Sequence, residues 1–352
     1  MKPMDSSNKS SDTREDLAAE RLSIERHLGL NRPRAVITEE IREAIASVTR
    51  GAMFERGGLC MGCKLKPMPG HYFVAQEYDP DREDLRGALA AALEEFNLQP
   101  ICADDFIWQG HVLCKVSALI QSTPFGIYEL SERQNRNVYL ELGIAIGLCR
   151  PFVLVKEKGA DLSPLCEGLE YYPINSYLEL RYEFGQKMQP LLAEIARYQP
   201  PLSPDPASRN SVIISHGGID VADFVLTVAR ELKSRGLTAV ITSDPTNKLT
   251  NYLKAERIPH YIIGDSGQTR LNETVAAIKA ARLGVYRIEK SAAPDAFITL
   301  GVAMALNRTG ILIHRSGSEL PSDLKGINAL EFTSHTVLQQ SFPEEFGRAL
   351  SR

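Results

Sequence analysis

Residues 136–155 read RNVYLELGIAIGLCRPFVLV, and this stretch decides the fold. Between Asn137 and Cys149, apolar residues occupy nearly the whole circumference of a helix, which predicts that the helix is largely buried. The helix leads into Phe152–Val155, a short apolar run typical of a buried strand. A buried helix joined to a buried strand is the unit from which α/β proteins with parallel sheets are built.

Short apolar runs alternate with helical segments on both sides of this stretch. The predicted strands are YFVAQEY at 72–78, QPICADD at 99–105, FGIYELS at 125–131, PFVLVKE at 151–157, SVIIS at 211–215, TAVITSD at 238–244, GVYRIE at 284–289 and GILIHR at 310–315. The predicted helices are Asp84–Phe96, Leu113–Ser122, Arg136–Cys149, Asp223–Lys233, Leu271–Ala281 and Ala292–Asn307. This alternation predicts an α/β fold whose parallel sheets are covered by helices on both faces.

The deciding stretch occurs twice. Residues 136–169 align without a gap with residues 294–327, at a constant spacing of 158 positions. Tyr128 and Tyr286 extend the match upstream at the same spacing. Two copies of one domain are therefore predicted. The identical pairs are Leu142/Leu300, Gly143/Gly301, Ala145/Ala303, Leu148/Leu306, Arg150/Arg308, Leu154/Leu312, Gly159/Gly317, Leu162/Leu320 and Gly168/Gly326.

The chain divides into four segments. Residues 1–70 are predicted to form a polar tail and a short helical segment, with helices at Glu15–His27 and Thr38–Arg50. The two predicted domains span 71–197 and 211–352. Between them, residues 198–210 read YQPPLSPDPASRN, and this run carries four prolines without apolar periodicity, which is typical of a linker.

Composition and charge exclude several classes of protein. With 43% hydrophobic and 24% charged residues, the chain has the composition of an ordinary globular protein. The net charge of −4 indicates no general attraction to nucleic acid or to an anionic membrane. The apolar runs are too short to span a membrane, and the N-terminus lacks the apolar centre of a signal peptide. We therefore expect a soluble, cytoplasmic protein with reduced cysteines.

One acidic residue stands out in the buried helix. Apart from Tyr139 and Cys149, Glu141 is the only ionisable residue between Asn137 and Cys149. It follows a predicted strand and loop, which places it near the edge of a parallel sheet where ligands bind. A buried carboxylate costs free energy unless it is bonded or functional, and the second copy has Thr299 at this position. Glu141 is thus a candidate catalytic group; the alternative is a glutamate that caps backbone amides of a neighbouring loop.

Two stretches resemble a known superfamily. The run FVAQEYDPDREDLRGALAAALEEFNLQPICADDFIWQGHVLCKV at 73–116, followed by NRNVYLELGIAIGLCRPFVLV at 135–155, is similar to the nucleoside 2-deoxyribosyltransferase-like and TIR-like nucleotide-binding proteins of bacteria. The second copy opens with VIISHGGIDVADFVLTVARELKSRGLTAVITSD at 212–244, which resembles the opening of TIR domains. The third strand of the superfamily usually ends in an acidic A-D-L type triplet, whereas this chain has Tyr128-Glu129-Leu130.

The resemblance implies a fold and a reaction. It implies two flavodoxin-like, TIR-like domains in tandem, with Glu141 catalytic in the first and the second degenerate. The implied reaction is hydrolysis of the N-ribosyl bond of NAD or a related nucleotide, as in antiphage defence enzymes of bacteria. Such a bond breaks through an oxocarbenium-like state that a carboxylate stabilises. The alternatives are a nucleoside deoxyribosyltransferase and a non-enzymatic nucleotide receptor. Beside a catalytic first domain, the degenerate second domain is expected to sense a nucleotide signal or to mediate homo-oligomerisation.

Further polar residues are candidates for binding. Asp104 and Asp105 at the end of a strand are placed to bind ribose hydroxyls or a base edge, or to form a turn and helix cap. In the second domain, a strand ends in a run that could hold a phosphate through backbone amides or form a plain tight turn. The remaining first-domain candidates are Tyr72, His111, Asn135 and Asn137, and those of the second domain are Ser215, His216, Gly217, Gly218 and Thr299.

Two cysteines have the spacing of metal ligands. Cys60 and Cys63 lie in GGLCMGCKLKPMPGH and supply half of a tetrahedral zinc site, to which His71 or Cys102 could contribute. Packed free thiols are the alternative. No cofactor is expected to be required for the reaction.

Overall fold

The computed structural model describes residues 65–77, 83–105, 111–131, 133–198, 210–216, 222–244, 247–263 and 270–351. Within these ranges the protein is α/β, with two sheets whose paired strands are all parallel. The predicted parallel α/β class is therefore confirmed. The predicted N-terminal helices, Cys60, Cys63, most of the predicted linker and the glycines Gly217 and Gly218 lie outside the described residues.

The first sheet has five strands in the order β2-β1-β3-β4-β5. Its strands are β1 (His71–Ala75), β2 (Gln99–Ile101), β3 (Gly126–Leu130), β4 (Phe152–Glu157) and β5 (Tyr171–Ile174). Its helices are α3 (Glu83–Leu93), η2 (Glu94–Phe96), α4 (Val112–Ser122), α5 (Arg136–Gly147), η3 (Pro164–Cys166) and α6 (Tyr177–Ile195). This strand order is that of flavodoxin-like sheets.

The second sheet has six strands in the order β11-β10-β9-β6-β7-β8. Its strands are β6 (Ser211–Ser215), β7 (Thr238–Ser243), β8 (His260–Ile262), β9 (Leu283–Arg287), β10 (Gly310–Arg315) and β11 (Leu330–Phe332). Its helices are α7 (Ala222–Arg235), α8 (Lys248–Ala255), α9 (Arg270–Ala280), α10 (Pro294–Ala305), η4 (Ser322–Leu324) and α11 (His335–Leu350).

The two halves follow the same path apart from one added unit. The helices α5 and α10 begin at Arg136 and Pro294, 158 positions apart, and β4 and β10 begin at Phe152 and Gly310 with the same spacing. The first strands, in contrast, begin at His71 and Ser211, only 140 positions apart. The added unit is α8 and β8, which extends the second sheet beyond β7. The expectation of a flavodoxin-like second sheet is thereby corrected, because the strand order there is that of the six-stranded Rossmann sheet.

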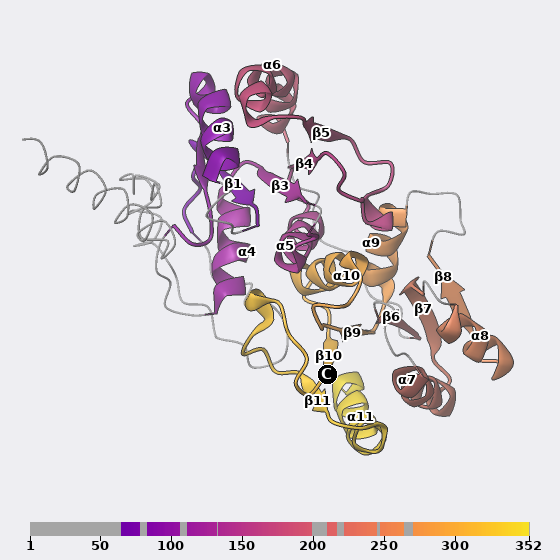
Figure 1. Cartoon of the computed structure of the whole chain (residues 1–352). Coiled ribbons are helices and arrows are strands. Elements are labelled where there is room, and N and C mark those ends of the chain that lie inside the picture. Colours follow the sequence, from indigo (N-terminus) through magenta and orange to yellow (C-terminus); the bar gives the residue numbers. More distant parts are fainter. Residues whose placement is uncertain are drawn as a thin grey trace, which may run out of the picture.

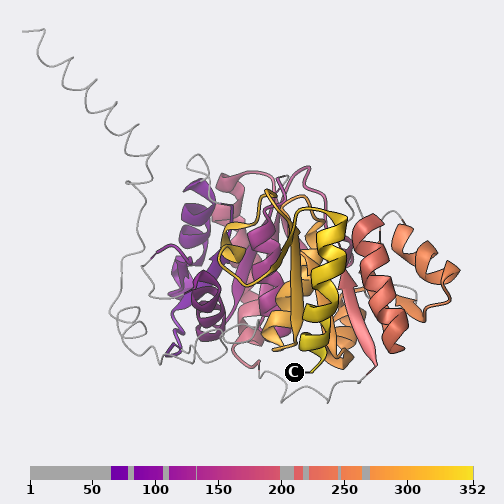
Figure 2. The ribbon, with the colours of Figure 1, turned by 90° about the horizontal axis from the view of Figure 1, so that it is seen from below.

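The helices of each half lie on both faces of its sheet. Figure 1 shows α5 and α10 side by side between the two sheets, with α3 and α6 beyond the first sheet and α7 and α11 beyond the second; Figure 2 shows the same arrangement from below. The main apolar core contains residues of both halves, among them Leu140, Ile144, Ile298 and Val302. Two further cores lie on the outer faces, one against α3 and α6 and the other against α7 and α11. The halves therefore share one continuous interior.

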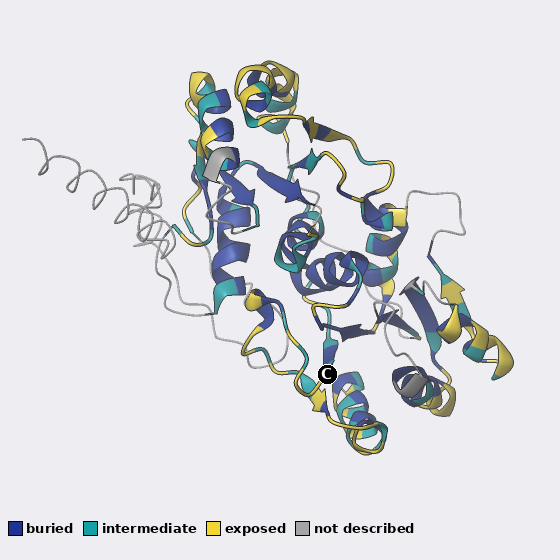
Figure 3. Cartoon of the chain, in the orientation of Figure 1, coloured by how far each residue is buried: buried dark blue, intermediate teal, exposed yellow. Residues whose placement is uncertain are grey.

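The predicted burial of the helix at 136–149 is confirmed for α5, and the structure shows what buries it. Nine of the twelve residues of α5 are buried, as are all twelve of α10, and most of both helices is dark blue in Figure 3. They approach so closely that a Cβ at Gly143 would lie 2.2 Å from the carbonyl oxygen of Ile298. A Cβ at Gly301 would lie 2.2 Å from the carbonyl oxygen of Leu140. These matched glycines let the two backbones touch. Among the described residues, no helix is long and apolar enough to cross a membrane.

Candidate functional site

Glu141 lies on α5 at the junction of the two halves. The residue is 7% exposed, and its side chain hydrogen-bonds with that of Asp323 from η4 of the second half. Asp323 is also 7% exposed. Two carboxyl groups that are distant in the sequence therefore form one buried pair.

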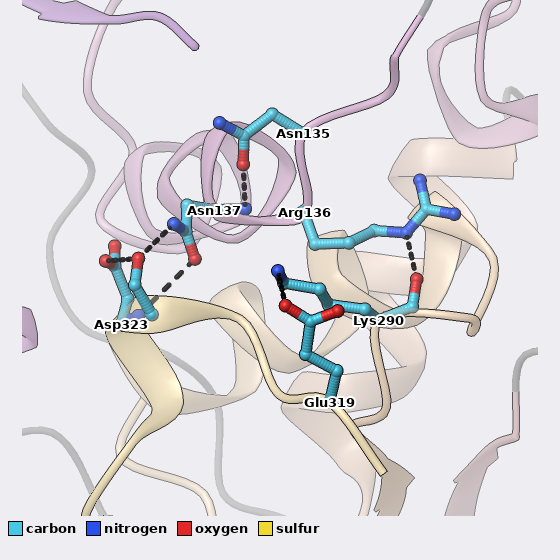
Figure 4. Close-up of polar contacts among 7 residues, drawn as sticks. Asn135, Arg136, Asn137, Lys290, Glu319 and Asp323 are labelled. Atoms are coloured by element: carbon cyan, nitrogen blue, oxygen red, sulfur yellow. Dashed lines mark hydrogen bonds and ion pairs between the residues drawn. The ribbon is translucent and has the colours of Figure 1, made fainter. Parts of the chain in front are cut away.

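Two polar side chains of the first half, Asn137 and His111, hold the segment that carries Asp323, and Figure 4 shows the contacts of Asn137. The Nδ2 of Asn137 donates to the hydroxyl of Ser322 at 2.6 Å, and the amide of Asp323 donates to Oδ1 of Asn137 at 3.4 Å. The Nε2 of His111 lies 3.1 Å from the carbonyl oxygen of Lys325. Asn137 is at the start of α5 and His111 caps α4, so both helix starts contact η4 and the residue after it.

A second set of hydrogen bonds and ion pairs joins the two halves beside the contacts of Asn137. The Nε of Arg136 donates to the carbonyl oxygen of Lys290 at 3.1 Å, and the ammonium of Lys290 forms an ion pair with Glu319. Figure 4 shows the contacts of Asn137 and those of Arg136 on the same side of α5. The start of this helix is thus fixed to the second half by side chain and backbone together.

The two carboxyl groups of the pair have different surroundings. Burial raises the pKa of Glu141 well above its usual value, and the neighbouring Asp323 raises it further. Burial also raises the pKa of Asp323, but four groups oppose that rise. They are the hydroxyl of Ser322, the imidazole of His111, the carboxyl of Glu141 and the ammonium of Lys115. Burial therefore raises the pKa of both carboxyl groups, and the two titrate as a pair.

Two other titratable groups belong to this neighbourhood. Lys115 on α4 is buried, which lowers its pKa, while Asp105 and Asp323 raise it. Tyr128 on β3 is fully buried, and burial raises the pKa of its phenol, as does the nearby Glu141. A buried lysine and a buried acid pair within one contact zone are typical of a functional site.

The equivalent contact of the second half, in which the start of α10 meets η3 of the first half, contains no such pair of acids. We call it the mirrored contact. Asp295 stands where Asn137 stands in the first half, and it accepts hydrogen bonds from the hydroxyl of Ser163 and, at 3.4 Å, from the amide of Leu165. Leu165 occupies the position of Asp323, and Thr299 that of Glu141. The hydroxyl of Thr299 donates to the carbonyl oxygen of Asp295 at 2.7 Å. The same packing therefore exists without two acids.

The other first-half candidates have structural partners. Asn135 caps α5 by accepting from the amide of Asn137 at 3.0 Å. Asp105 pairs with Arg86 at 2.6 Å and accepts from the amide of Cys102 at 2.7 Å, so it has the turn role that was the alternative for it. Asp104 is exposed in the same turn.

Tyr72 is placed in the core rather than at a ligand site. Its side chain is fully buried in the outer core of the first half. The ring stacks on Phe125, with centroids 5.4 Å apart and planes within 6°. As an early residue of β1 it is also far along the strand from the carboxyl end, where ligands of parallel sheets bind. The proposed contact between Tyr72 and a base is therefore not supported.

The second-half candidates at the end of β6 form a separate group. Ser215 is fully buried, and its hydroxyl has no hydrogen-bond partner among the described residues. The Nε2 of His216 lies 3.5 Å from a carboxylate oxygen of Asp244, and the His216 ring packs against Phe224. Burial raises the pKa of Asp244, but hydrogen bonds from His216 and Thr250 outweigh burial and lower it overall.

The zinc prediction rests on residues that the structure does not describe. In the ranges that it does describe, no group of three or more histidine, cysteine or acidic side chains could hold a metal ion. His71 and Cys102 are both buried there. Whether they could complete a site with Cys60 and Cys63 remains a prediction.

Sequence reasoning overlooked Asp323 and Lys115. Asp323 lies in the short helix η4, in a segment without periodicity, and only the spacing of 158 positions relates it to the apolar Leu165. A search for positions where one copy has an acid and the other does not would have found Asp323 as well as Glu141.

Comparisons with known proteins assign no family. No protein-family model matches the chain, and no curated protein is similar to it. Among solved structures, a ketoreductase domain from the bacillaene assembly line matches with a TM-score of 0.22 and 10% identity, over 81% of this chain and 92% of that one. A C2-type ketoreductase from a modular polyketide synthase matches with a TM-score of 0.24 and 12% identity, over 80% and 90% of the two chains. A UDP-forming trehalose-phosphate synthase from Burkholderia xenovorans matches with a TM-score of 0.27 and 10% identity, over 76% of each chain. Likeness at these TM-scores carries no argument about function.

Proposed function

We propose that this protein is a nucleotide N-glycosidase whose active site is composed of both halves. The observation that carries the proposal is the buried pair of Glu141 and Asp323, which joins α5 of the first half to η4 of the second. NAD and related nucleotides are the substrates that the resemblance implies, with transfer of the sugar to another base as the alternative to hydrolysis. Antiphage defence in the cytoplasm is part of the same proposal.

The chemistry of N-ribosyl cleavage needs two functions that a pair of carboxyl groups can supply. The sugar develops positive charge as the bond to the base breaks, and an ionised carboxylate stabilises that charge. The departing base gains electrons and is helped by a proton. Burial strengthens both effects because the surroundings have a low dielectric constant. In this proposal Asn137 and His111, which are only partly buried, contact the bound nucleotide.

Packing alone does not account for the pair. Removing two carboxyl groups from water costs free energy, and the cost rises when they share one site. The mirrored contact, with Thr299 and Leu165 at the matching positions, forms the same interface without it. The acids therefore support a role beyond holding the halves together.

The test is turnover of purified protein on a panel of nucleotides that includes NAD, with release of free base or nicotinamide as the readout. Glu141→Gln and Asp323→Asn should each lower turnover by at least about 10²-fold, equivalent to roughly 3 kcal/mol of transition-state stabilisation. Thr299→Ala, at the mirrored position, is the matched control and should leave turnover unchanged. A Glu141→Gln protein that is folded and fully active would refute the proposal.

The proposal also includes the duplication. Two TIR-like domains in tandem, of which the first is flavodoxin-like, preceded by a helical N-terminal segment, would give the matched spacing of α5 and α10. In this proposal each half supplies one carboxyl group of the pair, Glu141 from the first and Asp323 from the second. This would explain why only the first copy has the glutamate. Association into a homo-oligomer stays a prediction.

A nucleotide receptor in the second half is the second candidate, favoured by a reversal of charge. At the carboxyl ends of β3 and β4 stand Glu129 and Glu157, and the matching residues of β9 and β10 are Arg287 and Arg315. Arginine suits phosphate groups, and this end of a parallel sheet is where ligands bind. Calorimetric titration with nucleotides should then show binding that Arg315→Glu weakens. Identical affinity in that variant would remove this candidate.

A further inference from the structure

We infer that Ser322 is a positioning residue, whose hydroxyl holds the carboxyl group of Asp323 in the orientation in which it meets Glu141. Asn137 sets the direction of that hydrogen bond. The inference rests on the proposed function and deepens it, because it names the side chains that arrange the pair of acids without themselves acting on the bond that breaks. Three hydrogen bonds between Asn137 and the segment of Asp323 carry it (Figure 4).

The side-chain amide of Asn137 can lie in only one way. The backbone amide of Asp323 is a donor, and it lies 3.4 Å from one end of the Asn137 side chain, which must therefore be the oxygen Oδ1. The other end is then Nδ2, which can only donate, and it lies 2.6 Å from the hydroxyl oxygen of Ser322. Ser322 is thus the acceptor in its hydrogen bond with Asn137.

The single proton of the Ser322 hydroxyl is directed to Asp323. Because the hydroxyl oxygen accepts from Asn137, its own proton goes to a different partner, and Oδ1 of Asp323 lies 3.1 Å away. A hydroxyl that accepts on one side and donates on the other is fixed in both directions, and each bond strengthens the other. The carboxyl group of Asp323 is therefore held by a donor that is itself held from α5, the helix that carries Glu141.

The mirrored contact has a hydrogen bond of the opposite direction. Asp295 stands where Asn137 stands in the first half, and there the hydroxyl of Ser163 donates to the Asp295 carboxyl group. A carboxylate only accepts, so a serine beside it gives up its proton to it. Pro164, at the position that matches Ser322, has no hydroxyl. The asparagine of the first half thus leaves a serine proton available for an acid that the mirrored contact lacks.

Exposure separates this role from a role in folding. Ser322 is exposed, whereas the two acids of the pair are buried. Removing an exposed hydroxyl costs little stability, and the segment keeps the contact at 3.1 Å between Nε2 of His111 and the carbonyl oxygen of Lys325. The Asn137 amide keeps one N–H and one oxygen lone pair for a bound nucleotide. A change at Ser322 should therefore alter the arrangement of the pair and leave the fold intact.

The kinetic experiment uses the full chain and the nucleotide of the panel that wild type cleaves fastest. Ser322→Ala should lower kcat by about tenfold and change KM by less than about twofold, because the Asp323 carboxyl group loses its donor while the substrate loses no contact. Ser322→Thr keeps the hydroxyl and should bring kcat to within about threefold of wild type. Both variants should unfold at the wild-type concentration of denaturant, which separates lost activity from lost folding.

Asn137→Asp tests the direction of the hydrogen bond. The variant has the residue of the second copy, and an acid in the first turn of a helix is favourable, so folding should be preserved. The new carboxylate would draw the proton of Ser322 away from Asp323, and kcat should again fall about tenfold. Added to Ser322→Ala, the same substitution should lower kcat by less than about threefold more, because no hydroxyl proton is left to redirect. The reverse exchange in the mirrored contact, Asp295→Asn, is the control and should leave kcat unchanged.

Nuclear magnetic resonance follows the hydrogen bond itself, without relying on activity. In protein labelled with nitrogen-15 at asparagine, the side-chain amide signal of Asn137 is identified by its loss in Asn137→Asp. It should shift in Ser322→Ala and lie close to its wild-type position in Ser322→Thr. An unmoved signal in Ser322→Ala, wild-type kcat in that variant, or a further tenfold loss when Asn137→Asp is added to it would each overturn the inference.

Failure of the proposed function gives a different pattern of results. If wild type cleaves no nucleotide of the panel, the proposed function fails, and the catalytic role of Ser322 fails with it. The amide signal then still tells whether the hydrogen bond from Asn137 to Ser322 exists. If wild type is active, Glu141→Gln is inactive and Ser322→Ala has wild-type kcat, the proposed function stands and the role of Ser322 alone is wrong.

Discussion

Gly143→Ala tests whether contact between α5 and α10 holds the two halves in one structure. An added Cβ would lie 2.2 Å from the carbonyl oxygen of Ile298, whereas ordinary contacts of this kind begin at 3.4 Å. Because the opposing atom belongs to the backbone, no side chain can turn aside. The helices must move apart by about 1.2 Å, the difference between those two distances.

The size of the effect follows from that displacement. A gap of about 0.5–1 Å already removes a quarter to a half of the dispersion energy between packed atoms. Overpacking of a buried site costs about 1–3 kcal/mol and sometimes more, while replacing glycine by alanine within a helix recovers up to about 1 kcal/mol. After subtraction of this gain, we expect Gly143→Ala to lower the free energy of unfolding by about 1–2 kcal/mol. Gly301→Ala should act similarly and less than additively with it, because the first substitution has already separated the helices.

Chemical denaturation of the full chain measures this change, and the chain offers a matched control. Gly87 lies within α3, and a Cβ there would meet nothing within 4 Å. Gly87→Ala should therefore raise stability by about 0.5–1 kcal/mol. If Gly143→Ala stabilises the protein as much as Gly87→Ala does, the close contact between α5 and α10 is not present in solution.

Three further predictions concern titration, cleavage and metal. The raised pKa of Glu141 means that the folded protein keeps a proton that the unfolded chain releases above about pH 4.3. Wild-type stability should therefore fall as pH rises from there through the raised pKa, and Glu141→Gln should flatten that part of the curve; parallel curves for the two proteins contradict the assignment. Proteolysis within residues 199–209 should leave fragments that elute together in gel filtration, because the main core contains residues of both halves; fragments that separate without denaturant rule out a continuous core. If Cys60 and Cys63 bind zinc, elemental analysis should find about one zinc per chain, lost in Cys63→Ser, and a metal-free native protein ends that prediction.

The regular elements with apolar interiors could be predicted from the sequence. The strand at 310–315 matches β10 residue for residue, and the helix at 113–122 differs from α4 by one residue at its start. The elements that were not predicted are β5, α6, α8, β8, β11 and α11. The strand β8 has only three residues and lies at a sheet edge, so the sequence contains no apolar run that would predict it. Such edge elements are set by pairing with a neighbour rather than by their own periodicity.

The sequence by itself determined that 136–149 forms a buried helix, that it recurs 158 positions later and that Glu141 is an acid in an apolar setting. Those properties depend on residues close together in the chain, where periodicity is informative. Only the tertiary structure decided that the helix is buried against its own counterpart, and that Asp323 meets Glu141 across the junction. Contacts between residues so far apart in the chain leave no local pattern, because they arise when two finished surfaces pack together.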